Sequence, residues 1–212
     1  MIIAIDGTTA SGKGTIAKRL SAHYGLPHMD TGRLYRATGV AAMRAGVALD
    51  DADGVAAVAR SLDLADFDEA DLRTAEAGKA ASVVAAIAEV RQALFKLQRA
   101  FATQPLGALL DGRDIGTIIA PEADAKLWVD ASVEVRGARR WKELCGQGSD
   151  IALETVIEQL RVRDQRDQSR KDAPAEMAAD AVLIDTTDLT IEAAVEKAIA
   201  AVEAAMARGN RA

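Results

Sequence analysis

The residues best suited to chemistry lie near the N-terminus, in the stretch Gly7-Thr8-Thr9-Ala10-Ser11-Gly12-Lys13-Gly14-Thr15. This stretch follows a short apolar run and opens a segment with helical periodicity. Glycines let backbone N–H groups turn inward around phosphate oxygens, and the N-terminus of the following helix adds the positive end of its dipole. Lys13 would place a positive charge on the β and γ phosphates of a nucleotide. A plain glycine-rich turn is the alternative, but the Gly-x4-Gly-Lys spacing between strand and helix indicates phosphate binding.

The same loop predicts a metal ion without fixing its ligand. The strict pattern places Ser or Thr directly after the lysine to hold Mg²⁺. Here Gly14 takes that position and Thr15 follows. We expect ATP with Mg²⁺, and Thr15 is the candidate ligand from the protein.

Arginines follow the ends of two later apolar runs, where ligands of parallel sheets bind. Arg36 comes shortly after the run that ends at Asp30, and Arg113 and Asp114 come directly after Asp111-Gly112. Arginine is always charged and binds phosphate through two nitrogens. Phosphoryl transfer depends on positioning and on cations along the path of the moving group. The pattern therefore favours a kinase over a protein that only binds nucleotides.

Two further arginine clusters lie downstream. Within a helix, Arg163, Arg166 and Arg170 would share one face, and Arg163 and Asp167 would form an i,i+4 pair. A second cluster, Arg136, Arg139 and Arg140, opens another predicted helix. A solvated helix with surface ion pairs is an equally good interpretation of the downstream cluster alone.

The elements that position these residues alternate between short apolar runs and longer helical segments. The predicted strands are Ile2–Asp6, Leu26–Asp30, Leu106–Asp111, Ala125–Asp130 and Ala181–Asp185. The predicted helices are Gly14–Tyr24, Gly32–Ala45, Ala88–Phe101, Val133–Leu144, Leu153–Arg166 and Thr190 to about Ala207. This order predicts an α/β fold with a five-stranded parallel sheet and helices on both faces. Each strand ends in an Asp, and we interpret Asp130 and Asp185 as helix caps.

Composition narrows the class of protein. The formal net charge of −6 argues against a nucleic-acid or anionic-membrane binder. No apolar run reaches the roughly 18 residues of a membrane span, and the N-terminus lacks the basic start of a signal peptide. Cys145 is the only cysteine, which fits a reducing cytoplasm. His23 and His28 lack the close partners of a metal site or triad, so we expect core or surface roles for them.

Seven segments in combination resemble bacterial cytidylate kinases. They occur in the order of that family and span nearly the whole chain, and related P-loop kinases share the first segment but not the set. The segments are Gly7–Thr15, Asp30–Arg36, Ala80–Ala85, Val90–Leu94, Gln98–Phe101, Asp111–Thr117 and Arg163–Arg170. The resemblance implies a P-loop nucleoside monophosphate kinase fold and ATP, CMP and dCMP as the nucleotides bound.

The resemblance also implies roles for single residues. Ser82, Arg91 and Asp114 would face the cytosine, although Ser82 alone reads as a small helix residue and Arg91 as a surface arginine. The acceptor phosphate would meet Arg36, Arg113 and Arg170, and the sugar would meet Arg163 and Asp167. Thr31 stands where the family has a serine and keeps its hydroxyl. Arg136 and Arg140 would belong to a lid over ATP. Lys13, Arg113, Arg163 and Arg170 would neutralise the charge that develops during transfer.

The chain departs from the family in one region. Members usually carry a longer insert with β-strands before the position of Arg73, where only Leu62–Ala70 stands here. We therefore expect one domain, 1–212, with a shortened acceptor-binding insert at about 46–100 and a small lid at about 136–170. We also expect a monomer.

Two other functions stay open at this point. A P-loop kinase for another small acceptor would share the loop but would not need the base-reading residues. A nucleotide-dependent switch would need no second arginine-lined pocket, and the guanine-reading Asn-Lys-x-Asp pattern is absent. We predict transfer of the γ-phosphate of ATP to CMP.

Overall fold

The computed structural model describes residues 1–209, which divide into two compact units. One unit, here called the sheet unit, consists of residues 1–29 and the described residues from 102 onward. The other, the helical unit, is Asp30–Phe101. The boundaries predicted for the insert and the lid stay predictions, and the compact helical unit begins earlier than the predicted insert.

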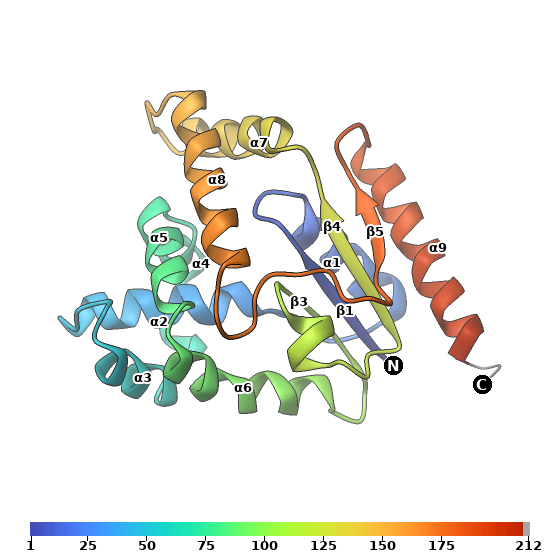
Figure 1. Ribbon diagram of the computed structural model, residues 1–212, viewed down its shortest axis with the longest axis horizontal. Helices are drawn as coiled ribbons and strands as arrows, with labels where there is room; N and C mark the ends of the chain where they lie inside the picture. Colours follow the sequence, from blue (N-terminus) through green and yellow to red (C-terminus); the bar gives the residue numbers. More distant parts are fainter. Residues whose placement is uncertain (210–212) are drawn as a thin grey trace. The chain divides into compact units, whose positions relative to one another are not determined.

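The sheet unit is built on five strands in the order β2-β3-β1-β4-β5 (Figure 1). The strands are β1 Ile2–Gly7, β2 His28–Asp30, β3 Ala108–Gly112, β4 Ala125–Asp130 and β5 Val182–Asp185. β1 pairs in parallel with β3 and β4, so Asp6 lies opposite both Gly112 and Trp128. A central strand flanked on both sides reads as an almost continuous apolar run, which is the pattern of Ile2-Ile3-Ala4-Ile5. The predicted five-stranded parallel sheet is confirmed.

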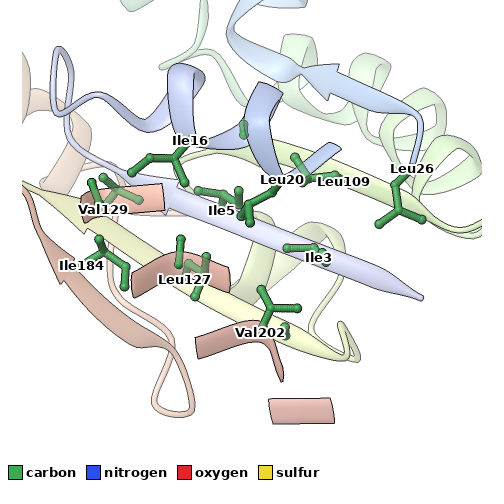
Figure 2. Close-up of a cluster of buried hydrophobic side chains, with 14 residues drawn as sticks. Ile3, Ile5, Ile16, Leu20, Leu26, Leu109, Leu127, Val129, Ile184 and Val202 are labelled. Carbon is green, nitrogen blue, oxygen red and sulfur yellow. The ribbon is translucent and has the colours of Figure 1, made fainter. Parts of the chain in front are cut away.

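Helices α1 Lys13–Tyr24 and α9 Ile191–Gly209 pack against this sheet and against each other. Figure 2 shows their apolar side chains meeting those of the strands, with Ile16 and Leu20 of α1 beside Ile5 of β1. Val202 of α9 lies beside Leu127 of β4 in the same cluster. Because this core anchors both β1 and α1, the segment that joins them is held at its two ends.

Two more helices of the sheet unit, α7 Val133–Gly146 and α8 Leu153–Gln168, pack on each other. Gly137 permits this approach, since a Cβ there would lie 2.3 Å from Cγ1 of Ile157. A single π-type turn, η2 Ile115–Ile119, follows β3 and contacts β1.

The helical unit contains α2 Thr31–Arg44, α3 Ala52–Arg60, η1 Leu64–Asp66, α4 Glu69–Leu72, α5 Ala75–Val84 and most of α6 Ala88–Ala102. Helices α2 and α5 pack closely at Gly39, where a Cβ would lie 2.7 Å from that of Ala80. A small core of Ala37, Val40, Phe67 and Leu72 holds α2 to the short α4 region.

Three local expectations were wrong. Asp130 and Asp185 are not helix caps: Ser132 caps α7 by accepting from the N–H of Val135, and Thr190 accepts from Ala193 at the start of α9. The Asp130 carboxylate instead accepts from the Thr8 hydroxyl at 2.5 Å, and Asp185 accepts from the N–H of Thr187.

The third concerns the downstream arginines. Helix α8 ends at Gln168, so Arg170 lies beyond the helix and does not share a helical face with Arg163. The chain turns at Ser169, and the guanidinium of Arg170 reaches back to Asp167.

Candidate active site

The glycine-rich loop joins the end of β1 to the start of α1, as the sequence predicts. Gly7 passes so close to β4 that a Cβ would lie 1.9 Å from the carbonyl oxygen of Val129. Gly12 is the N-cap of α1 and has a φ of 92°, a backbone conformation that residues other than glycine rarely adopt. Both glycines are therefore required by the geometry of the loop, and Lys13 is the first residue of the helix.

Two side chains of α7 and one that follows β5 donate to carbonyl groups of the loop. Arg136 donates to the carbonyl of Thr9 at 3.2 Å, and Arg139 donates to that of Ser11 at 3.3 Å. The hydroxyl of Thr186 donates to the same Ser11 oxygen at 2.8 Å. These contacts engage the carbonyls of Thr9 and Ser11. The N–H groups of the loop are the donors that could bind an anion.

Lys13 ends a chain of three ionisable side chains within the sheet unit. Its Nζ lies 2.6 Å from Oδ1 of Asp111, whose Oδ2 lies 2.7 Å from Nε2 of His28. Burial raises the pKa of Asp111, but the charge of Lys13 and the hydrogen bond from His28 outweigh it, so the pKa lies below its usual value. Asp111 is thus ionised and holds the loop lysine at the end of β3.

Asp6, at the end of β1, has different surroundings. Its two carboxylate oxygens accept from the backbone N–H groups of Ile115 and Gly116 at 2.9 and 2.8 Å. Burial raises the pKa of Asp6 to about 7, against the opposing effect of these two hydrogen bonds. Asp6 therefore joins the loop strand to the turn that follows Arg113 and Asp114.

The structure brings three predicted acceptor residues together beside the loop. The Nε of Arg113 lies 3.1 Å from Oδ2 of Asp167, and Arg170 donates to the other oxygen of that carboxylate. A second nitrogen of Arg113 donates to the hydroxyl of Thr9 at 2.7 Å. A pocket opens here, lined by Gly7, Thr8, Arg113, Trp128, Asp164, Asp167, Gln168 and Ala175.

Four predicted acceptor residues lie in the helical unit. Asp30 caps α2 and also pairs with Arg36 at 2.6 Å, so the segment after β2 is fixed at the start of the helix. Thr31 and Ser82 are buried, and the guanidinium of Arg91 lies 5.8 Å from the centre of the Tyr35 ring. These residues occupy α2, α5 and α6 of one compact unit.

The predicted lid arginines have unequal environments. Arg136 is buried and pairs with Asp164 at 2.7 Å, in addition to its bond to the loop. Arg140 pairs with Glu143 near the surface. Arg163 lies one position before Asp164 on α8, which packs on α7. Their roles toward ATP stay predictions.

Sequence reasoning missed several residues of this site. His28, for which a core or surface role was expected, pairs with Asp111, and Trp128 lines the pocket. Asp6 and Asp111 carried one available signal, because each is followed by glycine at the end of a neighbouring buried strand. Over residues 1–209, no helix is long and apolar enough to cross a bilayer.

A lysine-bearing loop between the central strand of a parallel sheet and a helix defines the P-loop nucleotide-binding class. The pocket beside the loop is lined in part by Arg113, a cation of the kind that phosphotransferases of this class use.

The sequence profile of the cytidylate kinase family matches residues 3–204. The chain is 57% identical over 205 residues to the cytidylate kinase of Methylocella silvestris, covering 97% of this chain and 95% of that protein. It is 58% identical over 204 residues to that of Xanthobacter autotrophicus, covering 96% and 98%. The chain belongs to the cytidylate kinase family, as the sequence motifs predict. The near-complete coverage also means that its length is close to that of these relatives.

Solved structures of lower identity agree on the fold alone. A gluconokinase from Sinorhizobium meliloti superposes with a TM-score of 0.51 at 12% identity, over 98% of this chain and 94% of its own. A protein from Eubacterium ventriosum gives a TM-score of 0.54 at 15% identity, over 96% and 98%.

Proposed function

We propose that the protein transfers the γ-phosphate of ATP to CMP and dCMP, giving ADP with CDP or dCDP. The observation that carries this proposal is the arrangement of Lys13, Arg113, Asp167 and Arg170 around one loop and pocket. Membership of the cytidylate kinase family supports the choice of acceptor.

The reaction needs positioning and charge, and no side chain has to act as a covalent nucleophile. An oxygen of the acceptor phosphate attacks the γ-phosphorus in line, and ADP leaves. Lys13 exchanges its partner Asp111 for phosphate oxygens, while N–H groups of the loop and of the first turn of α1 bind the remaining charge. Arg113 and Arg170 hold the acceptor phosphate, which places a cation at the side from which attack comes.

Asp167 and Arg163 are assigned to the sugar. Asp167 is buried and already holds Arg113 and Arg170, so its carboxylate can orient both arginines while accepting from a hydroxyl. Arg136 and Arg140 are assigned to the ATP side. Since Arg136 contacts the carbonyl of Thr9, its first contribution is to shape the phosphate loop.

Cytosine recognition is assigned to Ser82, Arg91 and Asp114, with Thr31 and Arg36 as further acceptor residues. The side chain of Asp114 makes no cap hydrogen bond to the turn that follows it, which removes capping as an explanation for this carboxylate. A carboxylate can accept from the exocyclic amino group of cytosine, whereas uracil presents a carbonyl oxygen at that position.

Mg²⁺ fits the donors of the site. The Thr15 hydroxyl is exposed on the first turn of α1, and the ionised Asp111 lies beside Lys13, so both offer the oxygen ligands that Mg²⁺ prefers. The ion would shield the β and γ phosphates and orient them for transfer. We also propose that the protein is a monomer in the cytoplasm. The single cysteine supports the cytoplasmic location, because a reducing compartment does not require disulfides.

One coupled assay tests the proposal. ADP formation is measured with ATP and Mg²⁺ and with CMP, dCMP, UMP, AMP, GMP or shikimate as the acceptor. We expect CMP and dCMP to be the best acceptors by a wide margin over AMP, GMP and shikimate. Equal rates with AMP and CMP would refute the choice of acceptor, and ATP hydrolysis without any acceptor dependence would favour a nucleotide switch.

A further inference from the structure

Asp6 is a buried carboxylate that binds two backbone amides of a separate segment. Its side chain leaves the end of β1 and accepts from two consecutive N–H groups, those of Ile115 and Gly116. The residue is 4% exposed. Burying a carboxylate is costly unless its oxygens are hydrogen-bonded, so this arrangement needs both amides in place.

The two amides are the first of the η2 turn. A helical turn leaves its first N–H groups without partners inside the turn, and the preceding residue commonly supplies a capping side chain. That residue is Asp114, a type that caps well, yet its side chain makes no cap hydrogen bond. Asp6 does the capping from another strand.

Gly116 lies close to the stem of Lys126 and to the carboxylate of Asp6. A Cβ at Gly116 would lie 3.2 Å from Cδ of Lys126 and 3.5 Å from Oδ2 of Asp6. The ammonium group of Lys126 pairs with Asp180, so this lysine packs its stem against the turn and directs its charge elsewhere. The Asp6 hydrogen bonds therefore fix where the turn lies against β1.

We propose that Asp6 is a positioning residue for acceptor recognition, which caps the η2 turn so that Asp114 does not have to. In this arrangement the Asp6 carboxylate holds the backbone of the η2 turn, and the Asp114 carboxylate binds the base of the acceptor. The same hydrogen bonds set the backbone that carries Arg113. The inference rests on the proposed function for the role of Asp114, whereas the capping itself does not.

The first experiment tests the capping without using the activity. Amide hydrogen exchange of the folded protein is followed by NMR for wild type, Asp6→Asn and Asp124→Asn. Asp124 is the matched control, because its exposed carboxylate also accepts from a backbone N–H, that of Ile2 at 2.6 Å. In Asp6→Asn, the NH₂ group of the new side-chain amide would face one of the two backbone N–H groups, which then loses its acceptor. We therefore expect the amide hydrogen of Ile115 or Gly116 to exchange at least tenfold faster in Asp6→Asn, and not in Asp124→Asn.

The second experiment tests positioning through kinetics. In Asp6→Asn we expect KM for CMP to rise roughly tenfold and the preference for CMP over UMP to narrow, with kcat changed less. Asp124→Asn should match wild type in all three quantities. Asp6→Ser serves as the second variant, since its smaller hydroxyl fits the same buried space and accepts from one N–H.

The outcomes separate the two ideas. If the amides of Ile115 and Gly116 exchange slowly in both wild type and Asp6→Asn, Asp6 does not cap the turn. Rapid exchange of both amides in the wild type also overturns the capping role, and this result needs no variant. A wild-type preference of CMP over UMP that neither Asp6 variant alters, despite faster exchange, overturns the positioning role. A wild type that does not distinguish CMP from other acceptors contradicts the proposed function and leaves the exchange result for Asp6 standing.

Discussion

Strands β1 and β3 lie side by side and both end in Asp-Gly, yet the two carboxylates have opposite surroundings. Asp111 faces Lys13 and His28, and its pKa is lowered although burial acts against this. Asp6 faces two backbone amides, and burial dominates, so its pKa is raised to about 7. Asp6 and Asp111 occupy the same position at the ends of their strands, and their different partners determine the direction in which each pKa shifts.

The comparison separates two tasks that meet at this edge of the sheet. Asp111 belongs to a charged chain that ends at the phosphate loop, so it acts on the group that contacts the nucleotide. Asp6 belongs to a backbone scaffold that ends at the η2 turn, so it acts on geometry. Variants at each end should therefore change different measured quantities.

The largest effect is expected at Lys13. Lys13→Ala should lower kcat about 10²–10³-fold, because a cation placed at the transferring phosphoryl group is lost. Circular dichroism should show an intact fold, since the side chain is not part of the apolar core. Lys18→Ala, an exposed lysine on the same helix, is the control and should retain wild-type turnover. A folded Lys13→Ala protein with near-normal activity would remove the loop from the active site.

A pH series tests the raised pKa of Asp6. Between about pH 4 and pH 7 the folded state binds a proton on Asp6 that the unfolded state has released, so this group contributes less stability as the pH rises. The free energy of unfolding, measured in urea at pH 5, 6 and 7, should therefore decline in wild type relative to Asp6→Asn. The slope for a single group reaches at most about 1.4 kcal/mol per pH unit.

The sign is the informative part of that series. Asp111, with a lowered pKa, stabilises the fold above its usual pKa and loses this contribution only as the pH falls below it. Asp124→Asn should run parallel to wild type. A difference between wild type and Asp6→Asn that stays flat from pH 5 to pH 7 would mean that the buried carboxylate is held ionised, because the unfolded Asp is already ionised over this range.

Asp114 should affect the choice between CMP and UMP. Asp114→Ala should lower kcat/KM for CMP far more than for UMP and narrow their ratio roughly tenfold to a hundredfold, because a buried unpaired polar group costs about 1–3 kcal/mol. The η2 turn should keep its place, since Asp6 accepts from its first two N–H groups. Equal losses with both acceptors would assign Asp114 to structure instead.

Local sequence patterns predicted much of the fold and of the phosphate-binding loop. The sheet, the loop and most helix ends follow from short apolar runs, glycine spacing and helical periodicity, all of which act over a few residues. The contacts that sequence missed join distant positions: Asp6 to Gly116, His28 to Asp111, and Arg139 to Ser11. Propensity says nothing about such pairs, since the topology of the sheet creates them.

The helix caps show the same limit at short range. Asp130 and Asp185 precede helices and are of a capping type, but Ser132 and Thr190 stand closer to the first turns and take the role. Asp130 is then available to the Thr8 hydroxyl. Arg170 was placed on a helix that ends two residues earlier, and its guanidinium pairs with Asp167, three positions before it.

The smallest effect is expected at His28. Substituting His28 tests the charged chain of His28, Asp111 and Lys13. His28→Leu removes the hydrogen bond to Oδ2 of Asp111 and leaves the ion pair between Asp111 and Lys13 in place. Asp111 should then hold the lysine more strongly, and ATP must compete for it, so KM for ATP should rise about threefold to tenfold, equivalent to about 1 kcal/mol. The KM for CMP should stay near the wild-type value. His28→Gln keeps an N–H donor and should recover most of the loss, which separates the hydrogen bond from simple packing. If His28→Leu and His28→Gln raise KM for ATP equally, the histidine matters for its shape, and the chain from His28 to Lys13 is not a functional unit.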